Sequence, residues 1–133
     1  MKKLIKKSSL ILSFSLGILL IGQIVYAQTS IDYSFRLPKY GSVNTGYVTK
    51  TNKDYHADHN ITYFGWPGSG VDSWLCDGDG NKITPTDTFY GKDVRQLFYI
   101  NGGPQYYYNS IKAVLKTDGN TFHECDVTGR IWP

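Results

Sequence analysis

The segment Tyr55-His56-Ala57-Asp58-His59 places two imidazoles and a carboxylate within four residues. Such groups bind zinc or copper, but a site needs three or four ligands held in place. His123 is the only other histidine of the chain, and it is far away in the sequence. We therefore predict a solvated loop between strands at this segment, with a metal site as the alternative.

A second candidate for metal binding is the run Asp77-Gly78-Asp79-Gly80-Asn81, which offers oxygen ligands at alternate positions. An EF-hand calcium loop would need glycine at its sixth position and glutamate at its twelfth. Lys82 and Thr88 occupy those positions. Because aspartate, asparagine and glycine favour tight turns, we predict a hairpin loop, with a weak calcium site as the alternative. We expect no cofactor for the protein.

The sequence does not specify a reaction. Glu124 is the only glutamate, which excludes a glycosidase with a pair of glutamates, although pairs of aspartates stay open. Spacing alone does not assemble a Ser-His-Asp triad, and no nucleophile elbow is present. We predict a protein that is not an enzyme.

Aromatic side chains are the strongest indication of function. Trp66 lies in a turn of glycine and proline from which a large ring cannot easily reach a core, and the run 106–108 contains three tyrosines. Exposed rings can stack on sugars or anchor a partner. We predict Trp66, Tyr106 and Tyr108 as binding residues, with coverage of the ends of the domain as the alternative.

Residues 1–27 have the pattern of a secretory signal peptide. Four lysines precede an apolar run from Leu10 to Ile24, and Ala27 ends a cleavage site. We predict cleavage after Ala27, which leaves residues 28–133 as one secreted, extracellular domain. The alternative is a retained membrane anchor, because the run approaches the length of a spanning helix.

Charge argues against two classes of partner. The formal net charge of the chain is +3, and removing the four leader lysines makes it −1. The other basic residues are scattered singly between Arg36 and Arg130. This pattern excludes a nucleic-acid surface and polybasic contact with an anionic membrane.

Cys76 and Cys125 are the only cysteines, and both follow the expected leader. A pair of cysteines in an oxidising compartment usually forms a disulfide. Closing a loop of about 50 residues would contribute about 4 kcal/mol in the chain-entropy model. We predict a Cys76–Cys125 bridge, with two buried free thiols as the alternative.

Short strands are predicted throughout residues 28–133, because aromatic and β-branched residues are frequent and helical periodicity is not sustained. Alternation is clearest over 31–37, and further strands are predicted at 43–50, 61–65, 71–76, 82–90, 94–100, 105–117 and 121–127. About six to eight strands with glycine-rich turns indicate an all-β fold. We predict a small antiparallel β-sandwich or partly closed barrel after a cleaved signal helix.

One buried face can be predicted from this alternation. It contains residues of the first strand and of the strand 105–117: Ile31, Tyr33, Phe35, Leu37, Tyr107, Ile111 and Leu115. Trp132, beside Pro133, is expected to fill the edge of the core.

Three segments, 31–36, 95–116 and 129–133, resemble an uncharacterised family of small secreted proteins from Gram-positive bacteria, a domain of unknown function. More remotely, the leader, the size and the segments 55–56 and 59–62 are similar to the lactococcin 972 family of bacteriocins. That resemblance implies a small β-sandwich that acts at the envelope of susceptible cells. We therefore expect a secreted, bacteriocin-like or cell-envelope-binding protein, with a carbohydrate-binding or adhesin-like module as the alternative.

Overall fold

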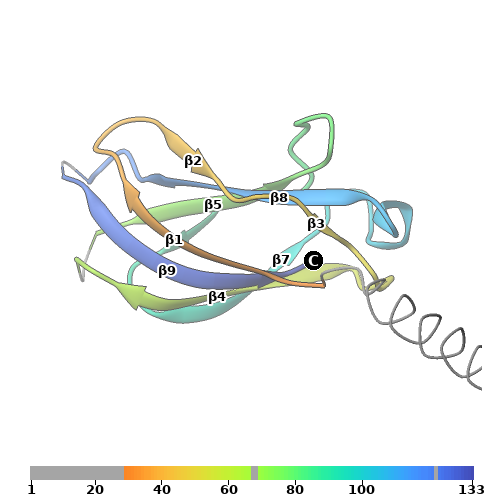
Figure 1. The fold of residues 1–133 in the computed structure, drawn as a ribbon. Coiled ribbons are helices and arrows are strands. Elements are labelled where there is room, and N and C mark those ends of the chain that lie inside the picture. The colour runs from red at the N-terminus through yellow and green to blue at the C-terminus, as the bar shows by residue number, and fades with distance from the viewer. Residues whose placement is uncertain (1–28, 67–68, 122) are drawn as a thin grey trace, which may run out of the picture.

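Two antiparallel β-sheets pack face to face in the computed structural model, which describes residues 29–66, 69–121 and 123–133 (Figure 1). The first sheet has the order β1-β9-β4-β7, with bounds Ile31–Leu37, Cys125–Trp132, His56–Phe64 and Asp93–Phe98. The second has the order β2-β8-β5-β6, and β3 also pairs with β8; the bounds are Ser42–Asn44, Ser110–Thr117, Val71–Cys76, Asp87–Phe89 and, for β3, Val48–Thr49. The predicted all-β sandwich is confirmed, and both sheets are open in the described residues.

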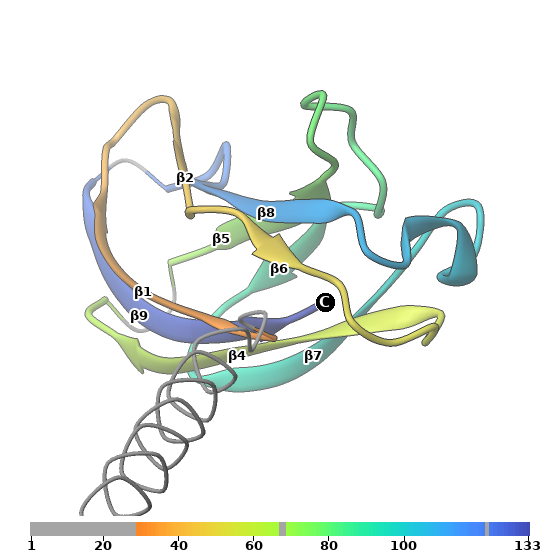
Figure 2. The same ribbon diagram turned by 45° about the vertical axis from the view of Figure 1, so that its right-hand side comes forward.

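The first sheet curves around the second, so that its inner face covers much of the core (Figure 2). In β1, Tyr33 and Leu37 are buried while Asp32, Ser34 and Arg36 are exposed, as the alternation predicts. No helix in the described ranges is long and apolar enough to cross a membrane.

The last strand differs from its predicted bounds of 121–127. β9 begins at Cys125 and continues to Trp132, with Val127, Gly129 and Ile131 on the core side. Trp132 therefore lies on the outer face, 37% exposed, and does not fill the edge of the core. The prediction was wrong because Gly129 hides the alternation: it has no side chain, yet it occupies an inward position.

The predicted strand 105–117 is shorter than expected. A 3₁₀ turn, η1 (Pro104–Tyr106), occupies its beginning, and Tyr108 has a positive φ of 63°. Ile111 and Leu115 are fully buried as predicted, but Tyr107 is 36% exposed and does not belong to their face. The irregular backbone before β8 removes Tyr107 from the register of that strand.

The predicted disulfide does not form in this structure, in which Cys76 and Cys125 are buried free thiols. Cys76 ends β5 and pairs with Lys112, near the start of β8, whereas Cys125 begins β9 in the other sheet. Gly70, which precedes β5, is hydrogen-bonded to Asp118 and Thr121. These two residues lie shortly before Cys125 in the sequence. Cys125 thus follows a segment that is hydrogen-bonded to the start of β5, whereas Cys76 lies at the end of that strand.

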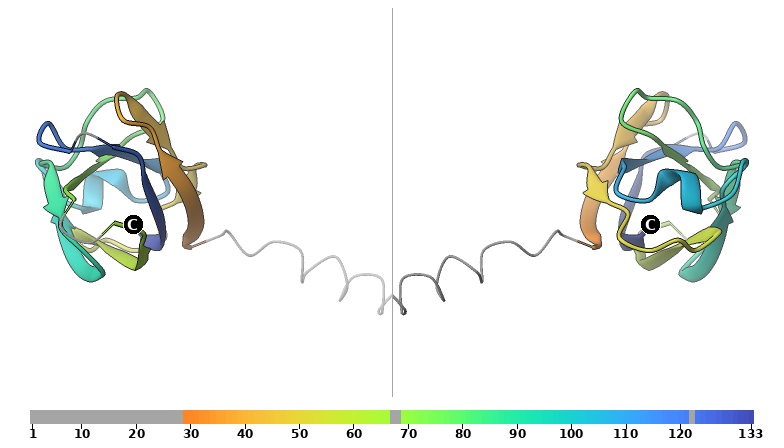
Figure 3. Two further views of the ribbon diagram at one scale, coloured as in Figure 1. Left: turned by 90° about the vertical axis from the view of Figure 1, so that its left-hand side faces the viewer. Right: turned by 90° about the vertical axis from the view of Figure 1, so that its right-hand side faces the viewer.

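Lys50 is fully buried at the end of the domain where β9 finishes. Its ammonium group donates to Asn52 Oδ1 at 2.7 Å and lies 4.7 Å from the centre of the Tyr99 ring. Burial lowers the pKa of Lys50. Asn52 Nδ2 in turn donates to the carbonyl of Pro133 at 2.9 Å, which holds the C-terminal residue between the sheets (Figure 3).

Candidate functional site

Two rows of side chains cross the outer face of the first sheet. Strand register places Trp132 of β9 opposite Asp58 of β4, and Asp58 opposite Gln96 of β7. The second row lies two residues further along each strand and contains Asp32, Arg130, Asn60 and Val94. We call these seven residues the sheet-face site. Their positions follow from alternation, since their neighbours on each strand face the core.

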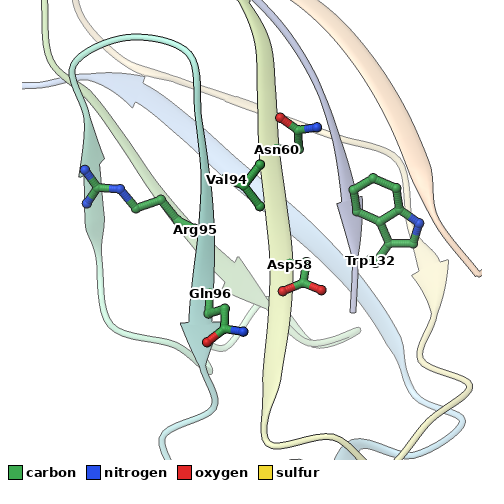
Figure 4. Close-up of a pocket in the computed structure, with 6 residues that line it drawn as sticks. All are labelled: Asp58, Asn60, Val94, Arg95, Gln96 and Trp132. Carbon is green, nitrogen blue, oxygen red and sulfur yellow. The ribbon is translucent and has the colours of Figure 1, made fainter.

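The two rows line adjoining hollows that share Asn60 and Trp132. The larger one, of about 770 Å³, lies over β9, β4 and β7, and the second, of about 440 Å³, extends over β1. Asp58 and Asn60 stand beside the indole of Trp132, whereas Arg95 points away from them (Figure 4). The indole therefore lies where the two hollows meet.

Charge at the site is partly neutralised. Both nitrogens of the Arg130 fork donate to the Asp32 carboxylate, Nη2 at 2.8 Å from Oδ2 and Nε to Oδ1. The hydrogen bond from Arg130 is the main cause that lowers the pKa of Asp32. The same guanidinium lies 5.4 Å from the centre of the Trp132 ring. The arginine is thus held between a carboxylate and an aromatic face.

Asp58 is different, because its ionic contact in the described part of the chain is with a histidine alone. Its Oδ1 lies 3.6 Å from Nε2 of His56, which is charged only when protonated. The Asp58 side chain is 47% exposed. This carboxylate can therefore accept hydrogen bonds from a ligand.

The site combines one aromatic plane with one accepting carboxylate and two amides. Asn60 and Gln96 can each donate and accept, while Asp58 accepts only. A pyranose ring presents an apolar C–H face to an aromatic ring and hydroxyl groups around its edge. The arrangement fits a hydroxyl-rich ligand with one apolar face.

Trp66, a predicted binding residue, is 54% exposed but lies away from the sheet-face site. Its ring packs on His123, with 3.9 Å between centroids, beside a separate hollow of about 340 Å³ that also contains Arg36 and Asp126. Asp126 is six residues before Trp132 on β9, which corresponds to about 20 Å.

The two predicted tyrosines do not share a surface with Trp66. Tyr108 is 67% exposed, and its backbone nitrogen donates to the carbonyl of Lys50 near the end of β9, whereas Trp66 lies near its start. Tyr106 is half-buried and packs against the core, 5.3 Å from the ring of Tyr99. The structure does not bring the three predicted residues together.

The segment 55–59, predicted as a solvated loop, is mostly the start of β4. His56 and Asp58 face outward, but His59 is fully buried between the sheets. Among the described residues, no group of three or more His, Cys, Asp or Glu side chains could hold a metal ion. In the loop after β5, the Asp77 carboxylate accepts from the backbone nitrogens of Asp79 and Asn81, as expected of a turn.

Residues of the site were missed because one strand was predicted to begin too late and another to end too early. The buried alternation of Ala57, His59 and Ile61 would have extended β4 and assigned Asp58 and Asn60 to its outer face. The same reasoning applied to Val127 and Ile131 would have placed Trp132 outside. A histidine and a glycine at core positions concealed these patterns.

No family model and no curated protein matches the chain. Among solved structures, a non-crystalline cellulose specific carbohydrate-binding module, CBM28, is similar with 8% identity and a TM-score of 0.37, covering 77% of this chain and 70% of that one. A family two carbohydrate esterase from Cellvibrio japonicus has 10% identity and a TM-score of 0.31, covering 77% of this chain. The infectious bursal disease virus VP2 subviral particle has 11% identity and a TM-score of 0.32, covering 79% of this chain.

The chain spans 33% of the length of the esterase and of the viral protein. With TM-scores below 0.5, these similarities carry no information about the function of this chain.

Proposed function

We propose that the protein is a secreted, non-enzymatic glycan-binding protein of the cell envelope, and that its ligand binds at the sheet-face site. The row Trp132–Asp58–Gln96 carries this proposal, because it sets an aromatic plane beside a carboxylate and an amide on adjacent strands. A sugar ring stacked on Trp132 would have its hydroxyl groups within reach of both polar side chains.

A rigid scaffold supports this use of the site. All three residues belong to strands that are hydrogen-bonded to each other, so binding requires little ordering of the backbone. Trp132 is further held by the Arg130 guanidinium on its own strand. A preorganised aromatic surface is typical of residues that dominate binding energy.

Binding without turnover is the simpler use of these groups. Glycoside hydrolysis usually needs two carboxyl groups, one on each side of the bond that breaks. In the two rows, Asp32 is bound to Arg130, which leaves Asp58 as the carboxylate open to a ligand. Incubation of the protein with a polysaccharide that it binds should therefore release no reducing ends.

The location at the envelope rests on the predicted leader and on the sequence resemblances. Bacteriocin-like inhibition of a related strain would follow from such binding if the bound glycan were needed for wall synthesis. An inhibition assay on Gram-positive strains tests this finer proposal separately from binding.

The experiment that tests binding is retention of the secreted protein on purified wall fractions and on immobilised polysaccharides. We expect Trp132→Ala to lose on the order of tenfold or more in affinity, as for an aromatic hot spot. Trp66→Ala is the matched control, because it removes an exposed ring about 20 Å away. Circular dichroism should show that both variants fold.

Two results would contradict the proposal. One is the absence of binding to every wall fraction and polysaccharide tested. The other is a loss of binding with Trp66→Ala and none with Trp132→Ala, which would transfer the site to the hollow beside His123.

A further inference from the structure

We infer that the sheet-face site selects uncharged saccharides and discriminates against anionic polymers such as teichoic acids and uronic acid chains. This inference rests on the proposed function and names the class of its ligand. It follows from the charges around Trp132, taken one at a time.

The guanidinium beside the indole is already occupied. Arg130 forms two hydrogen bonds with the Asp32 carboxylate, the same two-pronged geometry by which arginine recognises phosphate and carboxylate ligands. An anionic ligand would have to displace Asp32 from Arg130. The net charge of this pair toward a ligand is zero.

The other arginines offer no alternative. Arg95 borders the larger hollow, but its guanidinium contacts Asp87 and Asp93, at 2.8 and 2.9 Å, and points away from Asp58 and Asn60. Arg36 contacts Asp126 at 2.9 Å in the separate hollow beside Trp66. These are the remaining arginines of the chain, and both are committed to carboxylates.

No lysine is among the described residues that line the two hollows. None of the residues in β1, β4, β7 and β9 is a lysine. Asp58 is the carboxylate of the ligand surface that no lysine or arginine contacts in the described ranges. The described lining of the two hollows offers no free lysine or arginine to balance a phosphate.

Asp58 also restricts which chemical groups of a ligand can bind beside it. An ionised carboxylate only accepts hydrogen bonds, so the group that meets it must donate. A sugar hydroxyl does so, whereas a phosphate or carboxylate oxygen would face it with like charge. The site therefore favours a ligand whose edge carries hydroxyl donors.

The two hollows also suggest how such a chain lies. They share Trp132 and Asn60 and together extend over all four strands of the sheet. An extended saccharide would cross the strands, with sugars on both sides of the indole.

The test compares each polysaccharide with a negatively charged derivative, and the salt dependence separates the effect of charge from that of the substituent. Each neutral polysaccharide that the secreted protein retains, such as a soluble β-glucan, mannan or dextran, is compared with its own carboxymethylated derivative, and purified teichoic acid is included. At low ionic strength we expect the carboxymethylated form to bind more weakly by roughly two- to tenfold, and the difference to shrink with added salt.

Two variants locate the effect. Asp32→Asn releases the Arg130 guanidinium beside Trp132, and we expect it to reduce the discrimination by roughly two- to fivefold. Asp126→Asn is the matched control, because it removes one negative charge beside Arg36 in the hollow near Trp66 and should leave the ratio unchanged.

Equal or tighter binding of an anionic polymer, lost in Trp132→Ala, would overturn the inference while leaving the proposed function standing. An unchanged ratio in Asp32→Asn would also overturn it. If no polysaccharide binds at all, the proposed function fails, and the inference fails with it.

Discussion

The hydroxyl group of Tyr33 lies 2.7 Å from Nε2 of His59, with both side chains buried. On the other ring nitrogen, Ser73 Oγ of the second sheet lies 3.0 Å from Nδ1. A single imidazole thus joins the two sheets through the middle of the core. These hydrogen bonds matter for stability because a buried polar atom without a partner lowers the free energy of unfolding.

Removing the Tyr33 hydroxyl should therefore destabilise the protein. Tyr33→Phe leaves Nε2 of His59 without its partner, and we expect a loss of about 1–3 kcal/mol in the free energy of unfolding. Urea denaturation followed by fluorescence measures it. Tyr90→Phe, at a ring that is 60% exposed, is the control and should change stability little. Equal stability of both variants would show that the hydrogen bond contributes nothing.

Acid should weaken the fold through His59. Burial lowers the pKa of His59 to about 3 from its ordinary 6.5. Between these values the unfolded chain binds a proton that the folded protein does not, so the free energy of unfolding falls as the pH falls. We expect His59 to contribute a loss of about 2 kcal/mol between pH 7.5 and pH 5.0.

Urea denaturation at the two pH values measures this loss, and NMR titration of the His59 ring provides an independent measurement. The His59 resonances should stay at their neutral positions throughout this pH range. His123→Gln is the control and should lose as much stability between the two pH values as the unmodified protein. A His59 midpoint near 6.5 would contradict the assignment of the effect to this residue.

Both cysteines should react as thiols. Alkylation of the unfolded protein without a reducing agent is expected to add two alkyl groups, measured by mass spectrometry. In the folded protein the reaction should be slow, because burial raises the pKa of both Cys76 and Cys125 and covers them. A mass two protons below that of the reduced chain would restore the predicted bridge.

Gly129 has no room for a side chain. A Cβ there would lie 2.3 Å from the carbonyl oxygen of Asn60 and 2.5 Å from the Tyr33 hydroxyl. We expect Gly129→Ala to cost about 1–3 kcal/mol or more, because it forces apart the strands and the hydrogen bond to His59. Gly91→Ala is the control, since no described atom lies within 4 Å of the added Cβ. Thermal unfolding of the two variants compares them.

The sequence predicted strands where alternation is carried by large apolar residues. β1 and β5 have the predicted bounds, since Tyr33 and Leu37, or Val71 and Leu75, mark their inner faces. The prediction began β4 too late, at residue 61, and ended β9 too early, at residue 127, because His59 and Gly129 stand at inner positions. A histidine is assigned to a core only when its partners across the sandwich are known, and those come from distant parts of the chain.

The residues of the sheet-face site could not be predicted from the sequence. Exposed aromatic residues indicated binding of sugars or of a partner, and the residues selected were Trp66, Tyr106 and Tyr108, which lie outside the sheet-face site. The register that places Trp132 beside Asp58 joins residues 74 positions apart, as the pairing of β4 with β9 shows. The local spacing of residues does not predict that pairing, so the site can be recognised only once the strand order is known.

The position of β9 determines when the domain can fold. This last strand lies between β1 and β4, and it pairs with β1 from Ile31↔Ile131 to Leu37↔Cys125. Until its residues have been made, β1 has no partner within its sheet and β4 lacks one of its two neighbours. The first sheet can therefore be completed only after this strand has been added, although β1 and β4 come much earlier in the chain.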